Sequence, residues 1–260
     1  MEPEILYSRK EREGVAWAEI TLNRPDKGNA LTLPMLDRLE AIASGIRPDL
    51  AVRAVVLRGN GRSFCTGGDI AAWGGLTPQE MGRDWILRGI EVFSQIASLP
   101  QPVIAAITGH ALGGGLELAL SADLRIAVRS ARFGTPEVTL GMIAGWAGVR
   151  RLAETIGVAR ARRLALLGTP ISAEQALDWG LLTALAEDAA GLEEQIDQWI
   201  QQLLANAPIA MALTKGLLAS VHQDMRHAHA SAAAQAAASE DCREGVRAFL
   251  EKRKPAFRNR

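Results

Sequence analysis

The sequence is poor in cysteine and has no long uninterrupted apolar run. Its two cysteines, Cys65 and Cys242, lie far apart along the 260 residues and form neither a disulfide framework nor a zinc-binding pattern. The four histidines do not suggest a metal site either. The charged start, MEPEILYSRKEREG, has no apolar core of signal-peptide length, and no segment is apolar enough to span a bilayer. We therefore expect a cytoplasmic protein that binds no metal.

The sequence also lacks an excess of charge of either sign. Lys and Arg together number 29, as do Asp and Glu, so the formal net charge is zero. This balance argues against nucleic acid or an anionic membrane surface as a partner. Hydrophobic residues make up 48% of the chain, which is enough to fill a large core in a protein of this length.

Strand-like and helix-like patterns alternate in the first half of the chain. We expect strands at 14–22, 51–59 and 101–109, where apolar residues alternate or run together before a glycine or a loop. Helices are expected after Thr32 and over TPQEMGRDWILRGIEVFSQIASL at 77–99, a long amphipathic helix whose Thr77 begins a capping box. This alternation indicates an α/β core, and the last third of the chain is predicted to be helical.

Two glycine-rich turns follow the second and third of these strands. The first is GRSFCTGGDI at 61–70, and such a turn, taken alone, more often serves only to reverse the chain. The second has three glycines at 113–115 before a helical segment, so its free N–H groups could hold an anion or charge that develops in a reaction. The consecutive glycines do not fit a dinucleotide-binding fingerprint.

Two glutamates stand in otherwise apolar surroundings. Glu117 lies in LELALSAD, directly after the three glycines, and Glu137 lies in TPEVTLGMIAGW. Two carboxyl groups with shifted pKa values can perform acid and base chemistry on one substrate. Alternatively, Glu117 only complements the positive end of its helix. The spacing of twenty residues does not by itself place the two carboxyl groups together.

Five segments resemble, in order and spacing, the signatures of the enoyl-CoA hydratase/isomerase (crotonase) superfamily. The segment FCTGGDI resembles the family pattern F-x-A-G-A-D-[LI], and GHALGGGLELALSADLRIA resembles G-x-x-x-G-G-G-x-E-L-x-x-x-x-D. The other three are LNRPDKGNAL, ARFGTPEVTLGMIAGWAGVRRL and SEDCREGVRAFLEKRKPAF. Because the five matches are collinear and cover nearly the whole chain, they are more specific together than any one alone.

The resemblance implies a fold and a class of substrate. The expected fold is the α/β crotonase (ClpP-like) ββα spiral, with the acyl-CoA site in a core at 1–195 and a helical trimerisation region at 196–260. It implies an acyl-CoA thioester as substrate, no cofactor beyond the coenzyme A that the substrate carries, and a homotrimer or a hexamer built from two trimers.

The resemblance also implies roles for individual residues. Backbone N–H groups of Gly68 and Gly114 would form an oxyanion hole for the thioester oxygen. Glu117 would deprotonate a water molecule, Glu137 would protonate the α-carbon, and the N–H of Gly145 would help to hold the water. Coenzyme A would lie over loops 24–30 and 64–71. Candidates for contact with the coenzyme or the acyl group are Arg24, Lys27, Thr66, Gly67, Asp69, Ile70, Trp146, Phe249 and Lys252, although a basic tail is more often a solvated end than a binding site.

Two positions depart from the common hydratase pattern. Trp146 stands where such sequences have a small residue, so its indole either narrows the acyl pocket or packs in the core. Leu116 also replaces a commonly smaller residue. The implied activity is hydration of a trans-2-enoyl-CoA, with a delta-isomerase or another crotonase-type enzyme, and a non-catalytic acyl-CoA-binding protein, as the alternatives.

Overall fold

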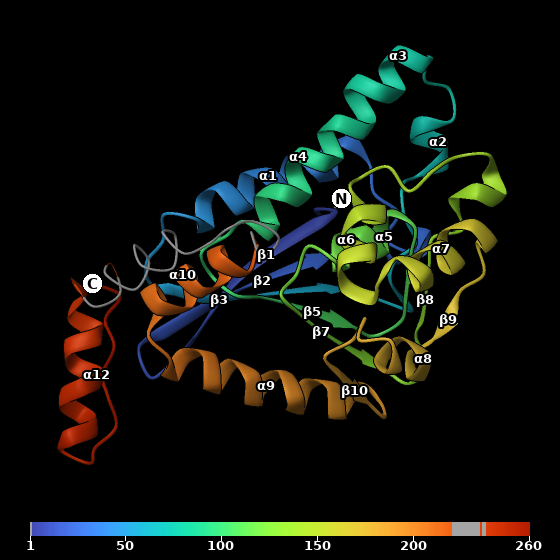
Figure 1. The fold of residues 1–260 in the computed structure, drawn as a ribbon. Coiled ribbons are helices and arrows are strands. Elements are labelled where there is room, and N and C mark those ends of the chain that lie inside the picture. Colours follow the sequence, from blue (N-terminus) through green and yellow to red (C-terminus); the bar gives the residue numbers. More distant parts are fainter. Residues whose placement is uncertain (1, 220–234, 236–237) are drawn as a thin grey trace.

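The computed structural model describes residues 2–219, 235 and 238–260, and it shows two sheets with helices packed around them (Figure 1). The larger sheet has six strands in the order β1-β2-β3-β5-β7-β10. These strands are β1 (Ile5–Arg12), β2 (Val15–Leu22), β3 (Val52–Gly59), β5 (Val103–Ile107), β7 (Leu124–Val128) and β10 (Ala184–Ala186). Only β1 and β2 pair antiparallel, and the other neighbours are parallel.

The smaller sheet is built from very short strands in the order β4-β6-β8-β9. They are β4 (Ser63–Cys65), β6 (His110–Leu112), β8 (Arg132–Gly134) and β9 (Ile171–Ser172). Strands β3, β5 and β7 of the larger sheet are each followed along the chain by β4, β6 and β8 of the smaller one, and then by helical structure. This repeated order of two strands and a helix confirms the predicted ββα spiral.

Helices cover both faces of the larger sheet (Figure 1). Helices α1 (Leu33–Ile46) and α4 (Leu87–Ala97) pack together on one side, while α9 (Ala189–Ala205) lies along β3, β5 and β7 on the other. The remaining helical segments are η1 (Pro25–Lys27), α2 (Ile70–Trp73), α3 (Pro78–Glu80), η2 (Met81–Ile86), α5 (Gly114–Ala119), η3 (Pro136–Leu140), α6 (Gly148–Ile156), α7 (Val158–Leu167), α8 (Ala173–Asp178), α10 (Pro208–Leu218) and α12 (Glu240–Leu250).

The local signals in the sequence form the expected structures. The side chain of Thr32 accepts a hydrogen bond from the N–H of Met35, and Thr77 and Glu80 form a reciprocal capping box. Each satisfies backbone groups that a helix start would otherwise leave unpaired. The long helix expected after Thr77 is interrupted by the wider turns of a π-helix, η2, before α4 continues it.

The C-terminal segment stands apart from the body of the molecule. Helix α12 projects at the end opposite to α5 and α6 (Figure 1). Its return segment is held by Arg53, which donates to the carbonyl of Phe257 at 3.4 Å and to that of Asn206 at 3.1 Å. The predicted division between 195 and 196 falls inside α9, whose Ile196 and Ile200 are buried in the core. The two-part division stays a prediction, although α9 as a whole packs on the sheet.

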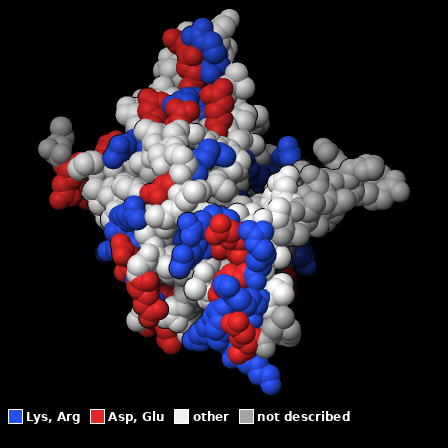
Figure 2. Space-filling view, turned by 90° about the vertical axis from the view of Figure 1, so that its left-hand side faces the viewer, with Lys and Arg blue, Asp and Glu red and all other residues white. Residues whose placement is uncertain are grey.

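The surface agrees with the balanced composition. Basic and acidic side chains are interspersed over the face shown in Figure 2, and many of them form ion pairs with one another. No helix in the described ranges is both long and apolar enough to cross a membrane.

Candidate active site

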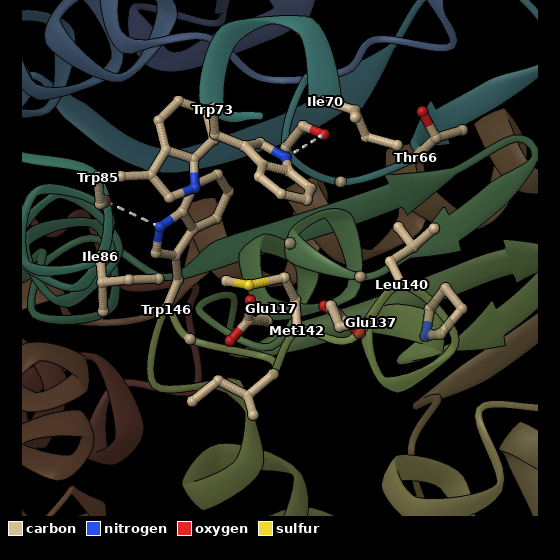
Figure 3. A pocket seen from close by; sticks show the side chains of 17 residues that line it. Thr66, Ile70, Trp73, Trp85, Ile86, Glu117, Glu137, Leu140, Met142 and Trp146 are labelled. Carbon is tan, nitrogen blue, oxygen red and sulfur yellow. Dashed lines mark hydrogen bonds between the residues drawn. The ribbon is translucent and has the colours of Figure 1, made fainter. Parts of the chain in front are cut away.

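A cavity of about 100 Å³ lies where the two glycine-rich turns meet η2 and the segment after β8 (Figure 3). Apart from glycines and the two glutamates, its lining is almost entirely apolar or aromatic. The lining residues are Thr66, Gly67, Gly68, Ile70, Trp73, Trp85, Ile86, Gly113, Gly114, Glu117, Pro136, Glu137, Leu140, Met142, Ile143, Gly145 and Trp146. The structure therefore brings the two glycine-rich turns, Glu117 and Glu137 together around one cavity.

The first glycine turn, after β4, is attached to the loop that precedes α1. The N–H of Leu31 donates to the carbonyl of Gly67 at 2.8 Å, and the N–H of Asp69 donates to the carbonyl of Leu31 at 2.8 Å. Gly67 has a φ of 110°, a conformation that side chains disfavour. The Gly68 N–H between these bonds donates to no acceptor in the described part of the chain, and is free to bind a ligand.

The second glycine turn begins α5 and lies directly against the first. A Cβ on Gly114 would lie 3.5 Å from the backbone nitrogen of Gly68, so the two N–H groups are close neighbours. A Cβ on Gly115 would overlap the carbonyl of Cys65 on β4, which explains why only glycine fits there. Gly113 has a φ of 54° and donates its N–H to the carbonyl of Gly134 at 2.8 Å, anchoring the turn to β8.

Glu117 lies in α5 with only 2% of its surface exposed. Its Oε1 accepts a hydrogen bond of 2.6 Å from the N–H of Gly148, at the start of α6. Burial and, to a lesser extent, the nearby charge of Glu137 raise the pKa of Glu117 to about 7, although the N–H groups of Gly148 and Trp146 oppose the shift. The charged form is thus costly to bury but has backbone donors that favour it.

Glu137 lies in η3 and faces the same cavity from the other side. Its Oε1 lies 3.0 Å from the position of a Cβ on Gly113, so the carboxyl group is next to the second glycine turn. Its Oε2 is buried and has no hydrogen-bond partner in the described residues. Burial raises the pKa of Glu137, which favours its protonated form.

The two carboxyl groups form a coupled pair. The charge of Glu137 disfavours ionisation of Glu117, so protonation of Glu137 would lower the pKa of Glu117. Glu117 has backbone donors for its charge, whereas Glu137 has a buried oxygen without one. The two carboxyl groups therefore differ in their hydrogen-bond surroundings, although burial raises the pKa of both.

Trp146 packs in the core and also lines the cavity, so a position in the core does not exclude contact with the cavity. It is 3% exposed, and its indole N–H donates to the carbonyl of Trp85 at 3.0 Å. The ring centroids of Trp85 and Phe93 lie 5.2 and 5.3 Å from that of Trp146. The indole touches the positions that a Cβ would take on Gly68 and Gly114.

The residues predicted to contact coenzyme A have different surroundings. Thr66, Gly67 and Ile70 line the cavity, whereas Asp69 caps α2 and pairs with Arg24 at 2.9 Å. Arg24 also pairs with Glu4 at 2.9 Å, so its guanidinium already has two carboxylate partners. Lys27, in the same loop, is exposed to solvent, so it is the more accessible of the two cations.

The predicted contacts from the tail lie far from this cavity within one chain. Phe249 is in α12, and Lys252 is exposed just after it, at the opposite end of the molecule from α5 (Figure 1). The side chain of Phe249 lies outside the described part of the structure.

Sequence reasoning missed several residues of the site. Gly148 donates to Glu117, and a Cβ on Gly148 would overlap the Glu117 side chain. Gly145 lines the cavity and receives the Ile86 side chain against its Cα. The recurring glycines at 141, 145 and 148 were the available signal, but Trp73 and Trp85 had none, because their helical segments read only as amphipathic surface.

Comparisons with known proteins agree with this architecture. Residues 11–260 match the family described as enoyl-CoA hydratase/isomerase. The chain is 38% identical over 257 residues to the short-chain-enoyl-CoA hydratase of Clostridium acetobutylicum, covering 96% of this chain and 97% of that protein. It is 34% identical over 259 residues to the crotonyl-CoA hydratase of Syntrophomonas wolfei, covering 97% of each. The crystal structure of enoyl-CoA hydratase from Bacillus anthracis superposes with a TM-score of 0.92, at 34% identity, over 99% of this chain and 100% of that one.

Proposed function

The chain belongs to the enoyl-CoA hydratase/isomerase family, and from this premise we propose that it adds water across the 2,3 double bond of a trans-2-enoyl-CoA thioester. The observation that carries the proposal is the convergence of the buried Glu117 and the half-buried Glu137 with two free backbone N–H groups in one apolar cavity. Addition of water to this double bond needs a base, an acid and a site for negative charge, and these groups can supply all three.

In the proposed mechanism, the thioester oxygen lies between the N–H groups of Gly68 and Gly114. Attack of water at C3 moves negative charge onto this oxygen, and two aligned donors stabilise that enolate more than the neutral thioester. Loss of one such donor typically costs about 10²–10³-fold in kcat. The glycines are needed at these positions because side chains there would collide with Trp146 and Trp85.

The two glutamates divide the proton transfers. Glu117, held by the N–H of Gly148, takes a proton from water as its oxygen bonds to C3. Glu137, whose buried Oε2 lacks a donor, delivers its proton to C2 and completes the 3-hydroxyacyl-CoA. Exchange of protons with solvent then restores the starting pair. The overall reaction moves no electrons to an external acceptor, so we propose that no separate cofactor takes part.

The test is turnover of a panel of trans-2- and 3-enoyl-CoA thioesters, followed by enoyl absorbance and product mass. We expect a gain of one water from the trans-2 substrates. Glu117→Gln and Glu137→Gln should each lower kcat by about 10²–10⁴-fold, because each removes one proton-transfer group while keeping the shape of the side chain. Glu154→Gln, on the exposed side of α6, is the matched control and should retain activity.

Each other outcome names an alternative. Conjugation of the 3-enoyl substrates without a change of mass would identify a delta-isomerase instead. Tight binding of acyl-CoA without turnover of any substrate would identify a non-catalytic binding protein. Full activity in either glutamine variant would remove that glutamate from the mechanism.

We also propose that the active form is a homotrimer or a pair of trimers in the cytoplasm. The projection of α12 away from its own cavity supports assembly, because it places Phe249 and Lys252 where a neighbouring subunit could bring them to coenzyme A. Two unpaired cysteines, Cys65 and Cys242, support a reducing compartment. Light scattering would test the assembly, and a mass of one chain at working concentration would contradict it.

A further inference from the structure

We propose that Trp146 forms the end wall of the acyl-binding part of the cavity and restricts the protein to short, unbranched acyl groups. This inference rests on the proposed function, since it names the substrate class of the same site. It is carried by the packing around the indole, by the glycine that faces it on α4, and by the small volume that remains.

The indole fills the space between the glycine turns and α4. Its six-membered ring touches the positions that a Cβ would take on Gly114 and Gly68. Its five-membered ring reaches α4, where it contacts Gly89. Because the N–H donates to the carbonyl of Trp85 and Phe93 meets the ring edge-on, the indole is fixed in this position.

Gly89 shows that α4 is shaped around this tryptophan. It lies inside an α-helix, where glycine is a poor helix former compared with alanine. A Cβ at this position would overlap three atoms of the Trp146 five-membered ring, so the absence of a side chain is required for the indole to lie there. A position that gives up helix propensity to admit one side chain indicates that this side chain has a specific place in the site.

A second contact closes the cavity beside Trp146. The Cδ1 of Ile86, the last residue of η2, packs against Gly145 so closely that a Cβ there would overlap it. Trp146 and Ile86 thus form one continuous wall on the side of the cavity away from Thr66 and Ile70 (Figure 3). A thioester bound at Gly68 and Gly114 would direct its acyl tail toward this wall.

The remaining space limits the size of that tail. The cavity volume is about 100 Å³ and the cavity opens to the solvent, so the indole limits the tail in the direction of the wall. A few carbon atoms beyond the thioester would fill the space before the wall, whereas a long chain or a ring directed toward it would collide with the indole. Removal of the Trp146 side chain would extend the cavity toward Gly89 and Phe93 on α4.

The test compares the wild-type protein with Trp146→Ala and Trp146→Phe. The affinities of saturated acyl-CoA thioesters from four to ten carbons would be measured by calorimetry, together with hydration of trans-2-enoyl-CoA of the same lengths. Trp179→Ala is the matched control, because Trp179 is also buried, at 7% exposure, but packs against Arg160 and Arg163 away from the cavity.

We expect the wild-type protein to favour the four-carbon ligands. Trp146→Ala should raise the ten-to-four-carbon ratio, both of affinity and of kcat/KM, by at least about tenfold, because one methylene in an apolar pocket already discriminates by roughly 10- to 200-fold. Trp146→Phe should fold with less disturbance and give a smaller shift in the same direction. Trp179→Ala should leave the ratio unchanged.

An unchanged ratio in both Trp146 variants, or equal shifts in the Trp179 control, would overturn the inference. The binding measurement separates this failure from failure of the proposed function. A length preference that depends on Trp146 without hydration would refute the hydratase proposal alone, whereas hydration with no dependence on Trp146 would refute only the wall.

Discussion

The replacement of Gly89 by alanine is expected to change protein stability in opposite directions, depending on what occupies position 146. Alanine is the better helix former by about 1 kcal/mol, so on helix propensity alone Gly89→Ala should stabilise α4. In the native protein, however, the new methyl group overlaps the Trp146 ring, and overpacking of this kind typically costs about 1–3 kcal/mol. The substitution should therefore be neutral or destabilising by up to about 2 kcal/mol.

Removal of the indole should reverse this result. In a Trp146→Ala background the overlap is absent, and Gly89→Ala should stabilise by about 1 kcal/mol. The difference between the two backgrounds is the coupling energy, which should be about 1–3 kcal/mol because the two residues are in direct contact.

Thermal unfolding of the four proteins at one fixed concentration measures this coupling. In a chain of this size, 1 kcal/mol corresponds to a shift in Tm of about 2–4 °C, and a fixed concentration removes any contribution from assembly. Equal shifts for Gly89→Ala in both backgrounds would show that α4 is not shaped around Trp146. That result would refute the packing argument independently of any enzyme assay.

Two further predictions concern Glu117 itself and Ala147, which directly precedes the Gly148 donor to Glu117. Burial raises the pKa of Glu117 from its usual 4.5 to about 7, so the stability it contributes is present below about pH 4.5 and is lost as the pH rises through about 7. Glu117→Gln should therefore gain up to about 3 kcal/mol over wild type between pH 4.5 and 8 in urea unfolding, and a pH-independent difference would contradict the buried charge. Ala147 has a φ of 66°, which costs an alanine about 1–2 kcal/mol, so Ala147→Gly should raise Tm despite the added freedom of glycine when unfolded. A lowered Tm would show that this strain is absent.

The sequence predicted the parts of the fold that depend on local patterns. The strand at 14–22 forms β2, the run at 51–59 contains β3, and Thr77 begins the expected capping box. By contrast, β4, β6 and β8 have three residues each, which is too short to show a strand period. They exist because each pairs with the next turn of the spiral, and that information is not local.

The site was predicted in its components but not in its geometry. Resemblance to a family indicated Glu117 and Glu137, and the spiral brings them to one cavity although twenty residues separate them. The donor to Glu117 is Gly148, a backbone contact that no side-chain pattern encodes. The dual position of Trp146, in the core and at the cavity, depends on Gly89, which lies 57 positions earlier in the numbering of the chain, and sequence spacing does not reveal such a pair.

The attachment of the first glycine turn to the loop before α1 has a consequence for the timing of catalysis. Leu31 brackets Gly68 with two backbone hydrogen bonds, and Arg24 ties the following Asp69 to the same loop. In the proposed mechanism, the described part of the chain therefore aligns the Gly68 donor before substrate binds. Binding of coenzyme A and alignment of the reacting carbonyl are then separate events. A substitution of the exposed Lys27, in the loop proposed to bind coenzyme A, should therefore raise KM and leave kcat unchanged.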